Sequence, residues 1–250
     1  MSWLSNLFSL GKKQPSPPPA PQLQLPVDEF ILPLGPRIEQ AGERACVACD
    51  LRMILDSAVL ARKFTPPADP TWEEIWRGAK GNDFRNQAIH PMQALIWLRN
   101  RGVIEAGLWL AVPAPGEPDW MDGKRALVAM YVDRVPVLMW VSWVDGLRIP
   151  SGPMVTTPLG QVRVANWEGY AGSVGQHTVM LFGWCPTPEV GRVMLCMSSE
   201  NARLFALKEA EFGRLCNVTD PRYAAHLYTL RPRREWYAPA APLPPSTITA

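Results

Sequence analysis

The chain has 250 residues, of which 47% are hydrophobic and 19% charged, and its formal net charge is +2. This length fits one globular domain with extensions or two small domains, and the hydrophobic content excludes a wholly disordered chain. A charge so close to zero gives no general attraction to nucleic acid or to an anionic membrane. The five cysteines form no spaced framework, and their odd number argues for synthesis in a reducing compartment.

The two ends of the chain differ in composition from its middle. Residues 1–10 carry apolar side chains at helical spacing, which predicts either a partner-docking or interfacial helix or a terminal helix that packs on its own domain. Residues 14–36 are dense in proline and predict an extended linker. We therefore expect an amphipathic segment and linker over 1–36, a folded domain over 37–236 and a disordered proline-rich tail over 237–250.

Targeting signals are few. No apolar run approaches the roughly 18 residues of a membrane span. The N-terminus has its positive charge after its apolar residues, so it is not a conventional signal peptide. We expect cytoplasmic synthesis, with delivery or secretion, where it occurs, by a route that needs no conventional signal peptide.

Helices are predicted in the first part of the domain. Residues 46–61 repeat apolar side chains at i, i+3 and i+4, with Asp50 among the charged residues off the apolar face. Thr71-Trp-Glu-Glu74 reads as a capping box for a short helix that ends near Gly81. Residues 91–101 predict a further helix, because proline opens it and Gly102 follows it.

The second part of the domain predicts mainly strands. Residues 125–133 are helical in pattern, residues 113–123 are rich in turn formers, and Asp145-Gly146 predicts a turn. Apolar or alternating segments predict strands over residues 103–112, 135–143, 161–167, 177–184, 192–197 and 226–230. Helices first and antiparallel strands afterwards predict an α+β domain with segregated layers.

Cys46 and His177 are the candidate reactive pair. Cys46 opens the first predicted helix, and His177 opens a buried strand far along the chain. A helix N-terminus and a nearby imidazolium both lower the pKa of a thiol, and the thiolate is the nucleophile in cysteine chemistry. The alternative is a buried core cysteine and a hydrogen-bonded core histidine, since free cysteines are among the most buried residues.

Four segments, in order, resemble the papain-like cysteine peptidase superfamily, especially its compact bacterial branches such as bacteriocin-leader peptidases and plant-pathogen effector peptidases. They are Gln40, Cys46-Val-Ala-Cys-Asp-Leu-Arg-Met-Ile-Leu, Val132-Asp-Arg-Val-Pro-Val-Leu, and Gly175-Gln-His-Thr-Val-Met-Leu-Phe-Gly-Trp. The family often has Cys-Trp-Ala-Ala-Cys-x-x-Met-x-Leu at the second. The resemblance covers residues 38–215, and the spacing of cysteine and histidine falls in the family's range of about 130–150 residues.

The resemblance implies a fold and a set of roles. The domain is expected to have a helical half packed on an antiparallel sheet. Cys46 would be the nucleophile, His177 the base, and Gln40 an oxyanion donor beside the Cys46 N–H. Asn201 is the expected third residue, with Ser198 and Glu200 as alternatives. The implied activity is cleavage of a peptide or isopeptide bond in a polypeptide through an acyl-thioester, without cofactor or metal.

Other interpretations remain open. A binding or adaptor module that has lost catalysis, and an acyl transferase that uses the same thioester, are both compatible with these residues. Cys46-x-x-Cys49 also matches half of a zinc site or a redox pair, but the other cysteines are solitary and no strand precedes the motif. The N-terminal segment is a candidate for docking the protein to a larger assembly. His90, before a helix-opening proline, is expected to be a cap or surface residue.

Overall fold

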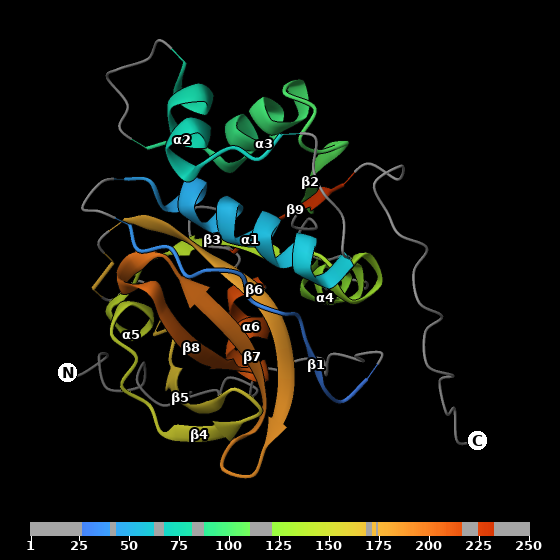
Figure 1. Ribbon diagram of the computed structural model, residues 1–250. Coiled ribbons are helices and arrows are strands. Elements are labelled where there is room, and N and C mark those ends of the chain that lie inside the picture. Colours follow the sequence, from blue (N-terminus) through green and yellow to red (C-terminus); the bar gives the residue numbers. More distant parts are fainter. Residues whose placement is uncertain are drawn as a thin grey trace, which may run out of the picture.

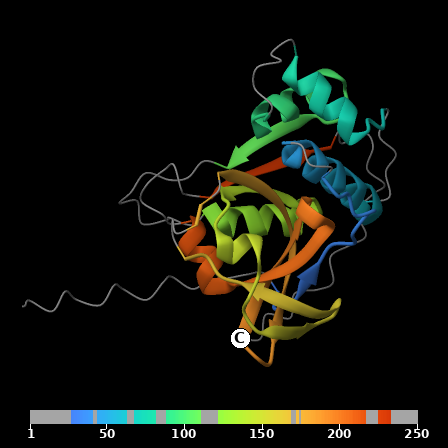
Figure 2. The same cartoon turned by 90° about the vertical axis from the view of Figure 1, so that its left-hand side faces the viewer.

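The computed structural model describes residues 27–40, 44–62, 68–81, 88–110, 122–168, 172–173, 175–216 and 225–232. The first three helices are α1 (Cys46–Arg62), α2 (Trp72–Lys80) and α3 (Pro91–Asn100). Figures 1 and 2 show α1 between the other two helices and a strongly curved sheet. A helical half therefore packs on a sheet half, and the predicted α+β class is confirmed.

Local sequence explains where α2 and α3 begin. The Thr71 hydroxyl accepts the Glu74 N–H, and the Glu74 carboxylate accepts the Thr71 N–H, so the predicted capping box is confirmed. At α3, His90 Nδ1 accepts the Met92 N–H, and Pro91 takes the first helical position. These contacts satisfy N–H groups that a helix leaves without partners at its start.

The strands of the described residues form one sheet in the order β2–β9–β3–β6–β7–β8–β5–β4, and β1 pairs with β6. The strands are β1 (Phe30–Ile31), β2 (Ala106–Leu110), β3 (Val137–Ser142), β4 (Met154–Thr157), β5 (Gly160–Ala165), β6 (Gln176–Thr187), β7 (Gly191–Ser198), β8 (Arg203–Lys208) and β9 (His226–Arg231). Later helical elements are α4 (Asp122–Asp133), α5 (Asp145–Arg148), the 3₁₀ turn η1 (Glu200–Ala202) and α6 (Glu209–Cys216).

The sheet differs in one respect from the wholly antiparallel arrangement that was predicted. β8 pairs antiparallel with β7 but parallel with β5, through Val164 opposite Ala206. Neither β8 nor α6 was predicted. The predicted Asp145-Gly146 turn is the start of the short helix α5. The predicted turn-rich segment falls mostly on residues outside the described ranges.

Strand β6 is the centre of the fold. Its first half pairs with β3, and its second half pairs on the same side with β1. Gly183 permits this, because a Cβ there would lie 2.5 Å from the Phe30 carbonyl oxygen. Phe30 and Leu32 are buried in the core. The predicted linker boundary at residue 36 is therefore too late: the described segment 27–36 packs with the domain, because its apolar side chains complete the core.

Helix α1 is buried around most of its circumference. Leu51, Ile54 and Leu55 belong to the core, as expected from their spacing. Asp50, which was expected on a polar face, is also fully buried. The physical reason is that α1 is enclosed by the sheet on one side and by α2 on another, so little of its surface remains for polar residues.

Candidate active site

Cys46 occupies the first position of α1, as predicted. It is half-buried, whereas the other four cysteines, all in described segments, are buried. Its thiol lies beside Thr178, whose backbone N–H and hydroxyl both interact with the sulfur. Thr178 follows His177 directly in β6, so the fold brings the start of α1 to the start of the predicted histidine strand.

The electrostatics of Cys46 run against the prediction of a lowered pKa. Burial raises the pKa of the Cys46 thiol, and the nearby Asp50 carboxyl raises it further. The backbone N–H groups of Thr178 and Val47 act in the opposite direction but are outweighed. The helix N-terminus is thus not the dominant influence, and the resting sulfur is a neutral thiol.

His177 is held on the strand by two neighbours. Its Nε2 lies 3.0 Å from the Ser198 hydroxyl oxygen, and the Trp143 ring covers it at 4.3 Å between centroids, inclined by 36°. Burial lowers the pKa of His177 to about 4, although the Glu200 carboxylate acts in the opposite direction. The imidazole is therefore neutral at physiological pH.

Glu200 connects the two neighbours of His177. Its backbone N–H donates to the Ser198 hydroxyl oxygen at 3.1 Å. Its carboxylate accepts the Trp143 Nε1–H at 2.5 Å and the Arg148 Nε–H at 3.3 Å. Because a hydroxyl oxygen has two lone pairs, Ser198 can accept from Glu200 and from His177 Nε2–H at once. One residue thus fixes both the hydroxyl beside the imidazole and the indole that covers it.

The segment before α1 brings Gln40 to the end of β7. The Gln40 backbone N–H donates to the Ser199 carbonyl at 2.8 Å, and the Ser199 hydroxyl lies 3.5 Å from the Gln40 side-chain oxygen. Residues 41–43, between Gln40 and the start of the helix, lie outside the described residues. Gln40 therefore lies beside the residue that follows Ser198, in the neighbourhood of the candidate site.

Among the candidates for the third residue, Ser198 is the one that contacts the imidazole. Strand β7 ends at Ser198, and the chain turns immediately into η1. Asn201, the first choice from sequence, is exposed in this turn and adopts φ 61°. Asparagine favours this left-handed backbone because its side chain can hydrogen-bond locally. In this structure the turn directs Asn201 away from the strand, while Ser198 remains on the face of His177.

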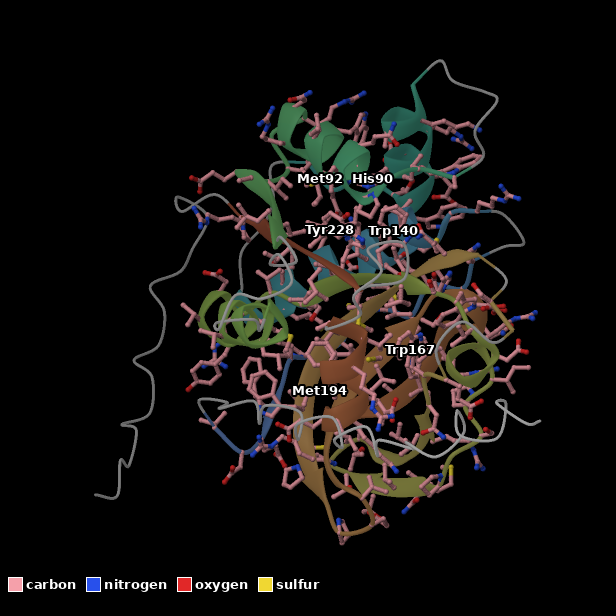
Figure 3. The ribbon with its side chains drawn as sticks, turned by 180° about the vertical axis from the view of Figure 1, so that it is seen from behind. His90, Met92, Trp140, Trp167, Met194 and Tyr228 are labelled. Atoms are coloured by element: carbon pink, nitrogen blue, oxygen red, sulfur yellow. The ribbon has the colours of Figure 1, made fainter. Side chains whose placement is uncertain are left out.

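The other two histidines form a separate aromatic cluster. His90 caps α3, as predicted, and its ring meets Trp140 edge-on at 4.7 Å and Tyr228 at 6.0 Å. His226 lies 5.8 Å from Trp140. Figure 3 shows His90 beside Trp140 and Tyr228, between α3 and the sheet. Trp140 is paired with Thr178, whereas Val141 is paired with His177, so the cluster lies on the opposite sheet face from His177.

Four residues of this neighbourhood were not identified from sequence as part of a site: Asp50, Trp143, Thr178 and Ser199. Trp143 is the last residue of a predicted buried strand, but its distance from His177 in sequence hides the stacking. Of the four, only Asp50 had a signal in the sequence that could have marked it as part of a site, namely a charged side chain one turn into an apolar helix. Its position in the apolar repeat of that helix, however, suggested a place on the surface. Cys49 is buried, and burial raises its pKa to about 12.

The described parts of the chain contain neither a metal cluster nor a membrane-spanning helix. There, no group of three or more histidine, cysteine, aspartate or glutamate side chains is arranged to hold a metal ion. In the same residues, no helix combines the length and the apolar character needed to cross a bilayer.

Solved structures resemble this chain in fold. Bromelain from Ananas comosus, in complex with the E64 inhibitor, matches with a TM-score of 0.50 and 11% identity over 80% of this chain and 94% of its own. Procathepsin L 3 from the larval midgut of Tenebrio molitor matches with a TM-score of 0.53 and 8% identity over 81% and 69%. The ragweed pollen cysteine protease Amb a 11, in its proform, matches with 0.51 and 13% over 83% and 66%.

The chain has the papain-like fold. At these identities the likeness extends to the fold and no further. No family model matches the chain, and no curated protein matches it in sequence. Within the papain-like fold, the start of α1 lies beside the start of β6 through Cys46 and Thr178, and the end of β7 contacts His177 through Ser198. The compact bacterial branch inferred from the motifs remains a prediction.

Proposed function

We propose that this protein is a cysteine peptidase in which Cys46 is the nucleophile, His177 the general base and Ser198 the residue that orients the imidazole. One observation supports this above all. A half-buried thiol begins α1 beside the residue next to His177, and the histidine is fixed by a hydroxyl on one edge and an indole on one face. A neutral imidazole held in this way can accept a proton from a neighbouring thiol.

The first chemical step follows from the neutral resting state of both groups. With its proton on Nε2 and donated to Ser198, His177 offers the Nδ1 lone pair. Nδ1 takes the thiol proton as the Cys46 sulfur forms a bond to the substrate carbonyl carbon. The oxygen becomes an oxyanion, which the Gln40 side-chain amide and the Cys46 backbone N–H stabilise; one such donor is worth about 2.7–4 kcal/mol in a well-studied protease.

The remaining steps return the enzyme to its resting state. The tetrahedral intermediate collapses, the carbon–nitrogen bond breaks, and His177 gives its proton to the leaving amine. The acyl group then remains on Cys46 as a thioester. Water, deprotonated by His177, attacks this thioester and releases the acid and the thiol. A polypeptide with a peptide or isopeptide bond is the proposed substrate. We also propose that the N-terminal segment docks the protein to a larger assembly, and that any delivery or secretion of the protein needs no conventional signal peptide.

A binding module without catalysis is the second candidate. The observation that favours it is that burial disfavours the charged form of both Cys46 and His177, and that the orienting group is a serine hydroxyl rather than a carboxamide. An acyl transferase would use the same thioester with an amine as acceptor. Product masses distinguish it, because transfer adds the acceptor mass and hydrolysis adds water.

The test uses fluorescein-labelled casein and a peptide joined through a lysine side chain as probes. Cys46→Ala and His177→Ala are expected to abolish cleavage, while His226→Ala, a histidine on strand β9, serves as the matched control and retains it. Incubation with E64, the inhibitor present in the bromelain structure, is expected to add its mass to the wild type but not to Cys46→Ala. If wild type and Cys46→Ala behave identically in both assays, the peptidase proposal is wrong and the binding module takes its place.

A further inference from the structure

Asp50 is a fully buried carboxyl group one turn after Cys46 in α1. Neither of its oxygens has a hydrogen bond of normal geometry with a described residue. Residues four apart on a helix have Cβ atoms about 5–6 Å apart, so the carboxyl lies close to the reactive sulfur. Buried, unpaired carboxylates are strongly disfavoured, and such groups keep their proton instead.

The surroundings of Asp50 connect it to both parts of the candidate site. The hydroxyls of Thr178 and Ser199 lie against the carboxyl group. Thr178 also interacts with the Cys46 sulfur, and Ser199 also contacts Gln40 through its backbone carbonyl and its hydroxyl. Asp50 therefore lies between the nucleophile and the proposed oxyanion donor, with one hydroxyl on each side.

No cation balances this carboxyl among the described residues. On α1, the ionisable neighbours are the thiols Cys46 and Cys49, and each is disfavoured as a thiolate by an Asp50 charge. The ring of His177, on β6, is directed to Ser198 instead.

Two carboxylates come from the other elements nearby. Glu200, after β7, directs its carboxylate to Trp143 and Arg148. Glu73 of α2 acts on Cys49. Among the described residues, the charges around Cys46 and Asp50 are thus negative or committed elsewhere, and ionised Asp50 would have no compensating cation there.

Building on the proposed peptidase function, we propose that Asp50 is a positioning residue that remains a protonated carboxylic acid in the working site, and that its ionisation suppresses thiolate formation at Cys46. When the carboxyl loses its proton to solvent, a negative charge appears one turn from the sulfur. The sulfur gains negative charge as it attacks, so the reaction slows. The protonated acid, in contrast, can donate to one hydroxyl and accept from the other.

The direction of the pKa shifts agrees with this geometry. Burial raises the pKa of Asp50 well above its usual range, and the Thr178 and Ser199 contacts only partly oppose it. Cys46 and Asp50 then titrate as a coupled pair, in which loss of the first proton hinders loss of the second.

The experiment measures the rate at which iodoacetamide alkylates Cys46, from acid to mildly alkaline pH, by mass spectrometry on the native protein. Asp50→Asn removes the ionisable proton with little change of shape. Asp56→Asn is the matched control, because Asp56 lies on the same helix but is half-buried and paired with Arg52. Asp50→Ser is made in parallel as a second neutral variant. The test can then be carried out even if only one of the two variants folds.

The expected result is a divergence on the alkaline side only. At acid pH all proteins should react alike. At alkaline pH, Asp50→Asn should react about tenfold faster or more, with the midpoint of its profile lower by about one to two pH units, as expected for unit charges about 6 Å apart at an effective dielectric constant near 20. Asp56→Asn should follow the wild type. Difference infrared spectra should also show a protonated-carboxyl band in the wild type that Asp50→Asn lacks.

Coincident profiles for the wild type and the folded Asp50 variant would overturn the proposal, and so would the absence of the protonated-carboxyl band. A purely structural role for Asp50 would change thermal stability and leave the profile in place. The alkylation rate depends on the thiol alone, so failure here leaves the peptidase proposal standing. Conversely, an inactive protein with a diverging profile would refute the peptidase function and retain the coupling.

Discussion

Burial of a neutral His177 should make the stability of this protein depend on pH. The ordinary pKa of the imidazole is 6.5, and in the folded chain it is about 4. Between these values the unfolded chain binds a proton at this residue and the folded chain does not. Stability from His177 is therefore complete above pH 6.5 and is lost as the pH falls to about 4, because the unfolded state binds more protons over this interval.

The size of the effect follows from the gap between the two values. One pKa unit corresponds to about 1.36 kcal/mol, so the gap represents about 3 kcal/mol of unfolding free energy. Urea unfolding should be measured above pH 6.5 and near pH 4. Between these two conditions the wild type should lose about 3 kcal/mol more unfolding free energy than His177→Gln, which has no imidazole to titrate. Taking the difference between the two proteins cancels the contributions of all other titrating groups.

A contrast variant and a refuting outcome complete this test. His90→Gln removes a histidine whose side chain is exposed. Partial burial and the nearby His226 also lower the pKa of His90, so this variant should change the pH dependence in the same direction but less than His177→Gln. If the wild type and His177→Gln lose the same free energy on acidification, the imidazole is not buried in the neutral form. His177 would then not rest as a neutral imidazole beside the Cys46 thiol.

Three further predictions concern the site and the fold. Ser198→Ala should lower kcat by about tenfold or more, since it leaves His177 Nε2 without its partner at a cost of about 1–3 kcal/mol, and Ser198→Thr should retain activity; peptide hydrolysis measures both. Trp143→Ala should expose the imidazole, raise the pKa of His177 toward 6.5 and move the acid limb of the pH–rate profile upward, while Trp143→Phe should preserve it. Gly183→Ala should destabilise the protein by about 1–3 kcal/mol in urea unfolding, because its Cβ would meet the backbone of β1. Gly213→Ala in helix α6 should instead stabilise the protein by about 0.5–1 kcal/mol. Equal effects of the two substitutions would contradict the close approach of β1 to Gly183.

Local rules predicted the elements that carry strong periodic or capping signals. Helix α1 begins at Cys46 because the apolar repeat starts there, and the reciprocal Thr71 and Glu74 contacts are present as the capping box required. Strands β6 and β7 were recognised as apolar runs. These signals depend on neighbours close in sequence, which is why sequence alone sufficed.

Contacts between distant segments were beyond the reach of such rules. Asp50 was assigned to a polar face because its neighbours, Thr178 on β6 and Ser199 just after β7, lie far along the chain. The identity of the histidine's partner depended on where β7 ends: the turn at Ser199 leaves Ser198 on the strand and carries Asn201 outward. A shift of one residue in that strand end would have changed which side chain faces the imidazole.

The pairing of β1 with β6 also has a consequence for how the chain can be shortened. Beyond β3, the edge of β6 is covered only by this short segment among the described residues, through backbone hydrogen bonds such as Leu32 N–H to the Phe182 carbonyl at 3.0 Å. A protein cut at the boundary suggested by composition, residue 37, would keep Gln40 and lose this cover. Its exposed strand edge would then offer unpaired N–H and C=O groups to other molecules, a template for edge-to-edge aggregation.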